Sequence, residues 1–194
     1  MNKRRSFITG IKSTSLLVKE RYFLKKYKPW GVILFSRNIK SILQTKKLTQ
    51  EIRKIFKDKN YPILVDQEGG RVNRFKKFFN ADLFTNKYFG DLYKKDRKKF
   101  YDYYKLFIQR TSYLLKLTGI NINTVPVLDL KIKSSSKIIG DRAFSGNPKV
   151  VSRIGNICID YYHKNNIGTV IKHIPGHGLA KVDSHKLTPT INKE

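Results

Sequence analysis

The hydrophobic residues of this chain fall into short runs that end abruptly in polar residues. Such runs occupy residues 6–11, 31–35, 61–65, 122–128 and 168–174. The runs that end at Phe35, Val65 and Leu128 lead directly into charged, hydroxyl or amide side chains. Continuous apolar character over so few residues is typical of strands buried on both faces, as in a parallel sheet. We therefore expect a parallel sheet with polar side chains at the carboxyl ends of its strands.

The segments between these runs have the periodicity of amphipathic helices. Apolar residues recur at near-helical spacing over 42–56, 94–117 and 149–163, and a shorter helix is expected over 16–24. Gly119 follows the second of these segments, at the position where a helix often ends in a left-handed residue. Strands that alternate with helices in this way predict βα units with right-handed crossovers and an α/β fold.

The chain is strongly basic, with 41 Lys and Arg against 14 Asp and Glu, a net charge of +27 and a pI near 10.2. Charge of this size, taken alone, indicates a nucleic-acid or anionic-surface partner. Lysine is nevertheless spread over every predicted helix, and clusters such as 76–77 and 94–99 are short. A dedicated polyanion site needs a basic stripe with interleaved aromatic side chains. We interpret the charge as a solvated surface and expect no nucleic-acid partner.

Neither a signal peptide nor a membrane span is evident in the sequence. Residues 1–5 begin like the charged part of a signal peptide, but the apolar run 6–11 is too short for its hydrophobic part and suits a first strand. The single cysteine, Cys158, excludes a disulfide within the monomer and lies on an apolar helix face, where we expect it in the core. We expect a cytoplasmic protein without membrane contact.

The densest group of reactive side chains lies near residue 180. The segment IKHIPGHG at 171–178 is followed by DSH at 183–185, so three histidines, a lysine and an aspartate fall close together. Glycine and proline interrupt the segment and exclude a regular helix, so these polar groups project from a loop. Polar side chains gathered where a buried strand ends predict a functional site.

These residues belong to a wider pattern that resembles one family. The pieces GVILFSRNI at 31–39, ILVDQEGGRVNRF at 63–75, PVLDL at 126–130, IGDRAFSGNP at 139–148 and IKHIPGHGLAKVDSHKLTP at 171–189 are similar to family 3 glycoside hydrolases of the bacterial β-N-acetylhexosaminidase type. The pairing of KHIPGHG with DSH is the most specific of these signals. The resemblance implies a (β/α)8 TIM-barrel type fold, of which about five βα units would be present.

The length departs from that family. A barrel of this type usually has about 250 residues, whereas the sequence has 194. The family's nucleophile is an aspartate in a Ser-Asp-Asp type motif on a later strand, and no segment of residues 1–194 matches it. We expect residues 1–194 to be the N-terminal part of the catalytic domain, incomplete at its C-terminus. A fragment and a shortened homologue without hydrolytic activity are both open at this stage.

The acid/base chemistry can be assigned from the residues. Retaining glycoside hydrolysis ordinarily uses two carboxylates, a nucleophile and a proton donor. His185 could supply the proton because imidazole titrates near neutral pH, and Asp183 could accept from one ring nitrogen and hold the tautomer. The resemblance implies the same pair, with His185 as acid/base and Asp183 as its partner.

Substrate binding is assigned partly from chemistry and partly from the resemblance. Asp66 stands at a strand end, where a carboxylate can accept two sugar hydroxyls; the alternative is an N-cap of the next helix. Further donors to hydroxyls or to the acetamido carbonyl are implied by the resemblance at Arg74, Arg142, Lys172 and His173. The substrate implied is an amino sugar, in a muropeptide or a chitooligosaccharide. No cofactor is implied.

Each of these residues also has a purely structural interpretation. Arg142 could form a surface salt bridge, His173 could be a satisfied core histidine and His177 could brace the glycine turn. Glu68 and Arg71 could pair with each other as scaffold. A zinc site from His173, His177 and His185 is disfavoured, because their spacing matches no compact metal signature.

Three functional hypotheses follow. The first is a β-N-acetylhexosaminidase that removes terminal N-acetylglucosamine from peptidoglycan fragments by a retaining mechanism, its nucleophile supplied beyond Glu194 or by a complementing C-terminal fragment. The second is an amino-sugar-binding module that does not hydrolyse, and the third is a basic nucleic-acid-binding protein. The DSH pair argues against the second hypothesis and the dispersed charge against the third. An open set of five βα units would also leave an unpaired edge strand at 168–174.

Overall fold

The structure is a computed structural model that describes residues 4–132, 138–178, 188 and 190. In the described part of the chain, five strands form one parallel sheet in the order β1-β2-β3-β4-β5. Their bounds are β1 Arg5–Gly10, β2 Pro29–Leu34, β3 Ile63–Val65, β4 Ile122–Asn123 and β5 Gly168–Thr169. Neighbours in the sheet are neighbours in the chain, which is the strand order of a (β/α)8 barrel. The predicted α/β class and parallel sheet are confirmed.

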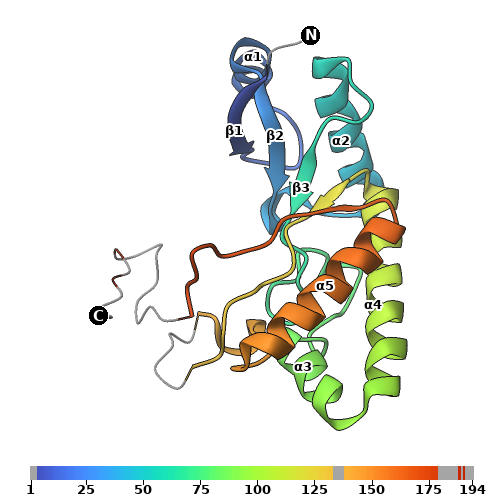
Figure 1. Cartoon of the computed structure of the whole chain (residues 1–194). Coiled ribbons are helices and arrows are strands. Elements are labelled where there is room, and N and C mark those ends of the chain that lie inside the picture. The colour runs from blue at the N-terminus through green and yellow to red at the C-terminus, as the bar shows by residue number, and fades with distance from the viewer. Residues whose placement is uncertain (1–3, 133–137, 179–187, 189, 191–194) are drawn as a thin grey trace.

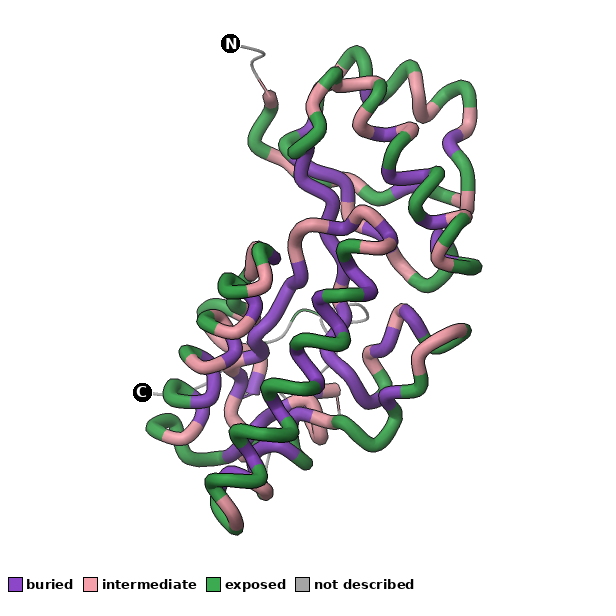
Figure 2. The backbone as a smooth tube through the Cα atoms, turned by 90° about the vertical axis from the view of Figure 1, so that its right-hand side faces the viewer, coloured by how far each residue is buried: buried purple, intermediate pink, exposed green. Residues whose placement is uncertain are grey.

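Helices follow the first four strands (Figure 1). They are α1 Val18–Tyr27, α2 Ile42–Phe56, α3 Asn86–Lys95, α4 Arg97–Thr118 and α5 Pro148–Lys164. Contacts run in sequence from α1 to α2, from α2 to α4 and from α4 to α5. Buried positions lie along the strands and the inward faces of these helices, whereas the outward faces are exposed (Figure 2). Parallel strands need this cover because their faces carry few polar side chains.

The helix boundaries are set by local capping. Ser41 accepts a hydrogen bond from the Gln44 backbone at the start of α2, and Asp96 does the same for Lys99 at the start of α4. Gly119 ends α4 with a φ of 75°, as predicted from its position. Pro148 occupies the first turn of α5, where its missing N–H costs no helical hydrogen bond.

Two features differ from the sequence-based prediction. The helix expected over 94–117 is observed as α4, which starts later because Lys94 and Lys95 end a separate helix, α3, and Asp96 caps α4; α3 itself was not predicted. The last two strands are shorter than the expected runs and end at Asn123 and Thr169. The segments that follow β4 and β5 remain hydrogen-bonded to each other, since the Leu128 N–H donates to the Lys172 carbonyl and the Lys172 N–H donates to the Pro126 carbonyl.

The core lies between the sheet and the helices and is rich in aromatic side chains, with Phe75, Phe89, Phe100, Tyr93 and Phe144 almost fully buried. Cys158 on α5 belongs to this core, as predicted. Among the described helices, none combines the length and apolar character needed to cross a membrane.

Candidate active site at the carboxyl ends of the strands

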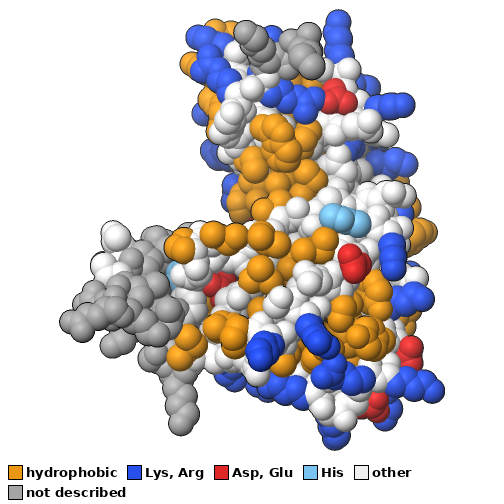
Figure 3. Space-filling view, viewed as in Figure 1, with side chains coloured by type: hydrophobic (Ala, Val, Ile, Leu, Met, Phe, Trp, Pro, Cys, Tyr) orange, Lys and Arg blue, Asp and Glu red, His pale blue; other side chains and the backbone are white. Residues whose placement is uncertain are grey.

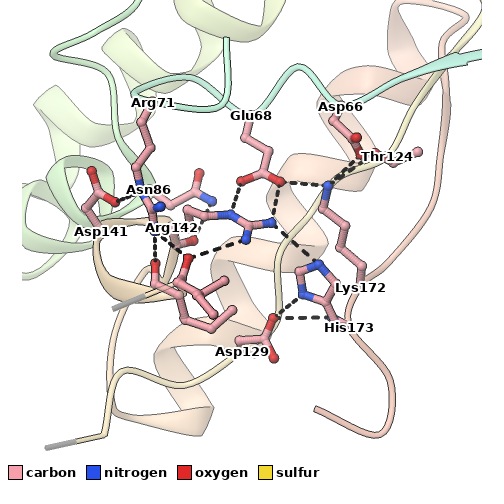
Figure 4. Close-up of polar contacts among 12 residues, drawn as sticks. Asp66, Glu68, Arg71, Asn86, Thr124, Asp129, Asp141, Arg142, Lys172 and His173 are labelled. Carbon is pink, nitrogen blue, oxygen red and sulfur yellow. Dashed lines mark hydrogen bonds and ion pairs between the residues drawn. The ribbon is translucent and has the colours of Figure 1, made fainter. Parts of the chain in front are cut away.

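A cluster of charged side chains lies beyond the carboxyl ends of β3, β4 and β5 (Figure 4). Asp66 and Glu68 follow β3, Thr124 and Asp129 follow β4, and Lys172 and His173 follow β5. Arg142 enters from the short 3-10 helix η2, Gly140–Arg142. The carboxyl ends of parallel strands meet at one edge, and this is where barrel enzymes place their active sites.

The loop after β3 is held rigidly by buried amides. Asn123 accepts from the Gln67 backbone N–H at 2.9 Å, and its side-chain amide donates to the Gln67 carbonyl at 2.9 Å. The Gln67 side chain in turn accepts from the backbone of Arg74 and donates to Asn73. Gln67 and Asn123 are both fully buried. These bonds fix where Asp66 and Glu68 stand relative to β4.

Gly69 gives this loop its turn. Its φ is +97°, and a Cβ at this position would lie 2.2 Å from the carbonyl oxygen of Phe84. Only glycine tolerates both the conformation and the close approach. The glycine of the DQEGG segment therefore allows the loop to turn back against the start of α3.

Asp66 accepts hydrogen bonds from three different side chains. Lys172 Nζ lies 2.9 Å from Oδ1, the Thr124 hydroxyl donates to the same oxygen, and Arg74 Nη2 lies 3.4 Å from Oδ2. Burial opposes ionisation of this carboxyl, but Lys172, Thr124 and Arg74 outweigh it, so the pKa of Asp66 is lowered. The N-cap alternative is wrong, because no helix begins after Asp66 in the described loop.

Glu68 forms an ion pair with two cations. Arg142 donates to both of its oxygens at 2.8 Å, and Lys172 Nζ lies 2.7 Å from Oε1. The Glu68 side chain is only 2% exposed and that of Arg142 14%. Both structural alternatives are therefore corrected: Arg142 is not in a surface salt bridge, and Glu68 does not pair with Arg71. Arg71 instead pairs with Asp141 at 2.9 Å.

His173 is oriented by Asp129. Nδ1 of His173 lies 2.5 Å from Oδ2 of Asp129, and the fully buried Asp129 side chain also accepts from the backbone of His173 and of His177. Arg142 Nη2 lies 3.4 Å from His173 Nε2, and a guanidinium can only donate. Nε2 is thus the acceptor and Nδ1 carries the proton toward Asp129. His173 is 36% exposed at its side chain, so it is not a core histidine.

The charges of this cluster balance. Three carboxylates, those of Asp66, Glu68 and Asp129, stand with three cations, those of Arg74, Arg142 and Lys172. His173, Arg74 and Asp66 have the most exposed side chains of the cluster. The arrangement can form directed hydrogen bonds to a ligand that carries no large charge of its own.

The structure brings together the five predicted binding residues, Asp66, Arg74, Arg142, Lys172 and His173. His185 and Asp183 lie outside the described residues. Sequence reasoning missed the roles of Asp129 and Thr124, although Asp129 was visible as a charge placed directly after an apolar run. The backbone N–H of His177 donates to Asp129, while within the described residues its ring nitrogens have no hydrogen-bond partner. In the part of the chain that the structure describes, no three His, Cys, Asp or Glu side chains cluster as metal ligands.

Five parallel strands, the first four each followed by helices, with polar side chains gathered at the carboxyl ends, define a barrel-type α/β protein with its site in the βα loops. The chain belongs to glycosyl hydrolase family 3: the model of the family's N-terminal domain matches residues 12–194. Its fold is accordingly of the TIM-barrel type.

Curated relatives and solved structures agree with this membership. A Beta-hexosaminidase of Xanthomonas campestris is 34% identical over 178 residues, which cover 92% of this chain and 53% of the relative. NagZ from Neisseria gonorrhoeae superposes with a TM-score of 0.85 at 31% identity, covering 96% of this chain and 54% of NagZ. The same enzyme has been solved in complex with N-trifluoroacetyl-D-glucosamine, again with a TM-score of 0.85. The chain spans about half the length of the curated relatives it matches.

Proposed function

We propose that this chain supplies the sugar-binding part of a β-N-acetylhexosaminidase that removes terminal N-acetylglucosamine from peptidoglycan fragments. The observation that carries the proposal is the preformed, charge-balanced cluster around Asp66, Lys172 and His173. Relatives named Beta-hexosaminidase, and a neighbour bound to an N-acylated glucosamine, support an amino-sugar ligand. The compartment proposed is the cytoplasm, which is supported by the place of the apolar residues 6–10 in β1 of the sheet.

In this proposal each side chain has a chemical task. Asp66 is the carboxylate most able to accept sugar hydroxyls, since it is 19% exposed and is held ionised by Lys172. Arg142 stands where it can donate to the acetamido carbonyl or to hydroxyls, and Nε2 of His173, 3.4 Å from Arg142 Nη2, can accept from a hydroxyl. His185 would protonate the leaving oxygen and later take a proton from water, and Asp183 would hold its tautomer.

The proposed reaction retains configuration and needs a carboxylate nucleophile that this chain does not show. Asp66, Glu68 and Asp129 are each neutralised by cations or a histidine at short distance, which leaves them poor nucleophiles. We infer that the nucleophile comes from βα units that complete the barrel, in a continuous chain or in a complementing fragment. The relatives are about twice as long as the matched region, which leaves room for such units.

The ends of the described sheet support this completion. Ile8 on β1 and Val170 and Ile171 just after β5 are exposed although apolar. A groove of about 590 Å³ lies between α5 and the segments near residues 130 and 175, lined by Leu128, Leu130, Val151, Ile159 and Ile171. Unpaired strand edges and apolar grooves of this kind favour pairing with further βα units.

The distribution of charge argues against a polyanion ligand. In Figure 3, hydrophobic side chains occupy the centre of the face, and Lys and Arg are spread around it and over its lower part without forming one continuous stripe. The site itself balances three anions with three cations. A neutral sugar meets no electrostatic penalty there, whereas a phosphate chain would meet Asp66 directly.

The test combines binding with turnover. We would titrate the chain with N-acetylglucosamine by calorimetry and assay release from a chromogenic β-N-acetylglucosaminide. We expect the wild type to bind N-acetylglucosamine. Binding should be lost in Asp66→Asn and kept in the exposed control Asp82→Asn. Wild-type protein that binds no amino sugar would overturn the proposal.

Turnover distinguishes an enzyme from a binding module. Release that disappears in His185→Ala would show that the acid/base pair operates. Sugar binding without any release, also after addition of a C-terminal half-barrel from a relative, would favour the non-hydrolysing module. That second function is kept because the five proposed binding residues all lie in the described part of the chain, whereas the sequence contains no nucleophile motif.

A further inference from the structure

Of the two carboxylates in the cluster that pair with Lys or Arg, Glu68 is the more deeply buried. Its side chain is 2% exposed, against 19% for Asp66. A ligand in the open part of the site can therefore reach Asp66, but Glu68 is covered by Arg142 and Lys172 (Figure 4). Any effect of Glu68 on a ligand must act through these two side chains.

The two oxygens of Glu68 divide their contacts in a specific way. Within the described residues, Oε2 accepts from Arg142 Nε at 2.8 Å, whereas Oε1 is shared between Arg142 Nη2 at 2.8 Å and Lys172 Nζ at 2.7 Å. The bidentate bond fixes the plane of the guanidinium. That plane determines where Nη2 stands, 3.4 Å from His173 Nε2.

The ammonium group of Lys172 is also held by a full set of hydrogen-bond partners. An ammonium has three donors, and Nζ has three acceptors: Oδ1 of Asp66 at 2.9 Å, Oε1 of Glu68 at 2.7 Å and the hydroxyl of Thr124 at 3.2 Å. Lys172 thus bridges the two carboxylates of one loop. Because Glu68 also binds the ammonium of Lys172, the position of that group relative to Asp66 is fixed. Lys172 contacts Oδ1 of Asp66, which leaves Oδ2 for other donors.

We propose that Glu68 is a positioning residue for sugar binding: its buried carboxylate aligns Arg142, Lys172 and, through them, His173 and Asp66, without touching the ligand. This inference rests on the proposed function and names the residue that pre-organises that site. Burial opposes ionisation of Glu68, but the bonds from Arg142 and Lys172 outweigh it and lower its pKa, so the carboxylate stays charged near neutral pH.

Two substitutions separate geometry from charge. Glu68→Gln keeps the size of the side chain but offers one acceptor oxygen and turns an amide N–H toward a cation. Glu68→Asp keeps the charge but is one methylene too short to reach both cations. Asp141→Asn is the matched control, because it removes a carboxylate from an exposed ion pair in η2, the element that also carries Arg142.

The first readout does not depend on sugar. In a ¹⁵N–¹H spectrum, the Nε–H of Arg142 is expected as a sharp signal protected from exchange in the wild type and in Asp141→Asn. It should shift and exchange faster in Glu68→Gln and in Glu68→Asp. Unchanged protection in both variants would overturn the positioning role, even if the wild type bound no sugar.

The second readout is the dissociation constant for N-acetylglucosamine. Both Glu68 variants should bind about 10- to 100-fold more weakly, the range expected for lost bonds to charged groups, while Asp141→Asn binds as the wild type. Full affinity in Glu68→Asp would show that charge alone suffices and would overturn the proposal. If Glu68→Gln does not fold, as judged by circular dichroism, Glu68→Asp carries the same test with the charge retained.

Discussion

Asp129 and His173 are joined at 2.5 Å between a carboxylate oxygen and Nδ1, and the same carboxylate accepts backbone N–H groups from His173 and His177. One buried side chain after β4 therefore fixes both the ring and the backbone of the loop after β5. The hydrogen bond selects the tautomer of His173 and leaves Nε2 as an acceptor toward Arg142. The orientation of a proposed sugar-binding residue thus depends on a strand that is not its own.

Asp129→Asn should loosen this loop and weaken sugar binding. Three N–H groups now bind the two oxygens of Asp129, two from His173 and one from His177, whereas the amide has one acceptor oxygen, so at least one of these donors is left unsatisfied. A loss of about 1.5–3 kcal/mol in unfolding free energy is expected from a broken bond to a charged group. Urea unfolding measures it, and hydrogen exchange at the His177 amide should accelerate.

The control for this prediction is Asp91→Asn. Asp91 pairs with Lys87 on the exposed face of α3, where an ion pair contributes little. Equal stability of Asp129→Asn and Asp91→Asn would contradict the anchoring role of Asp129.

The stability of the protein should fall as the pH falls below the ordinary range of carboxyl groups. The pKa values of Asp66, Glu68 and Asp129 are all lowered; burial alone would raise them, and their cationic or hydrogen-bonding partners outweigh it. A carboxyl whose folded pKa is lowered contributes stability that is complete above its unfolded pKa and is lost as the pH drops through the folded value. Urea unfolding at a series of pH values measures this slope.

The slope should be shallower in Glu68→Gln, because one of these carboxyl groups is then absent. Asp82→Asn, at an exposed position, should leave the slope as in the wild type. The range from pH 5 to pH 3 extends about one unit on either side of the ordinary pKa of Asp and Glu. A wild-type stability that rises on acidification over this range would contradict the lowered pKa values of the three carboxyl groups.

Gly69→Ala should destabilise the loop that carries Asp66 and Glu68. The φ of +97° and the approach of the Phe84 carbonyl leave no room for a methyl group. A cost of about 1–3 kcal/mol or more is expected from the strained backbone. Thermal unfolding measures it. Gly10→Ala is the matched control, since its nearest contacts are the side chains of Arg37 and Phe35 at 3.3 Å and can adjust.

Cys158 should be unreactive in the folded protein. Burial raises the pKa of its thiol to about 12, so almost no thiolate is present near pH 8. A thiol reagent such as DTNB should label the chain only after addition of denaturant. Rapid labelling of the native protein would show that α5 is not packed as described.

The sequence predicts the framework well because the framework depends on local patterns. The apolar runs before Ser36 and Asp66 mark β2 and β3, and the helical spacing of 42–56 gives α2 with the bounds observed. The division of α3 from α4 was missed because Asp96 lies in a continuous lysine-rich stretch, where its capping role is hidden. β4 and β5 were extended too far because apolar residues continue past the ends of both strands. Pro126, which has no N–H to donate, follows soon after β4, and the two segments pair again only at Val127 and Lys172.

The site is less predictable because its pairs come from distant segments. Glu68 was paired with Arg71, three residues away, whereas the fold brings in Arg142 from η2 and Lys172 from beyond β5. Local spacing cannot identify such partners. Asp129 illustrates the same point, since its partner His173 follows the next strand of the sheet and a whole helix separates them in the chain.

The internal neutrality of the cluster within a chain of net charge +27 has a kinetic consequence. Long-range fields steer charged molecules toward a protein and are weakened by salt, but they exert little force on an uncharged sugar. For the proposed amino-sugar ligand, encounter would then be governed by ordinary diffusion, and discrimination would begin only when hydroxyls come within hydrogen-bond range of Asp66. The surface lysines can therefore vary in number and place without altering which small molecule the pocket selects.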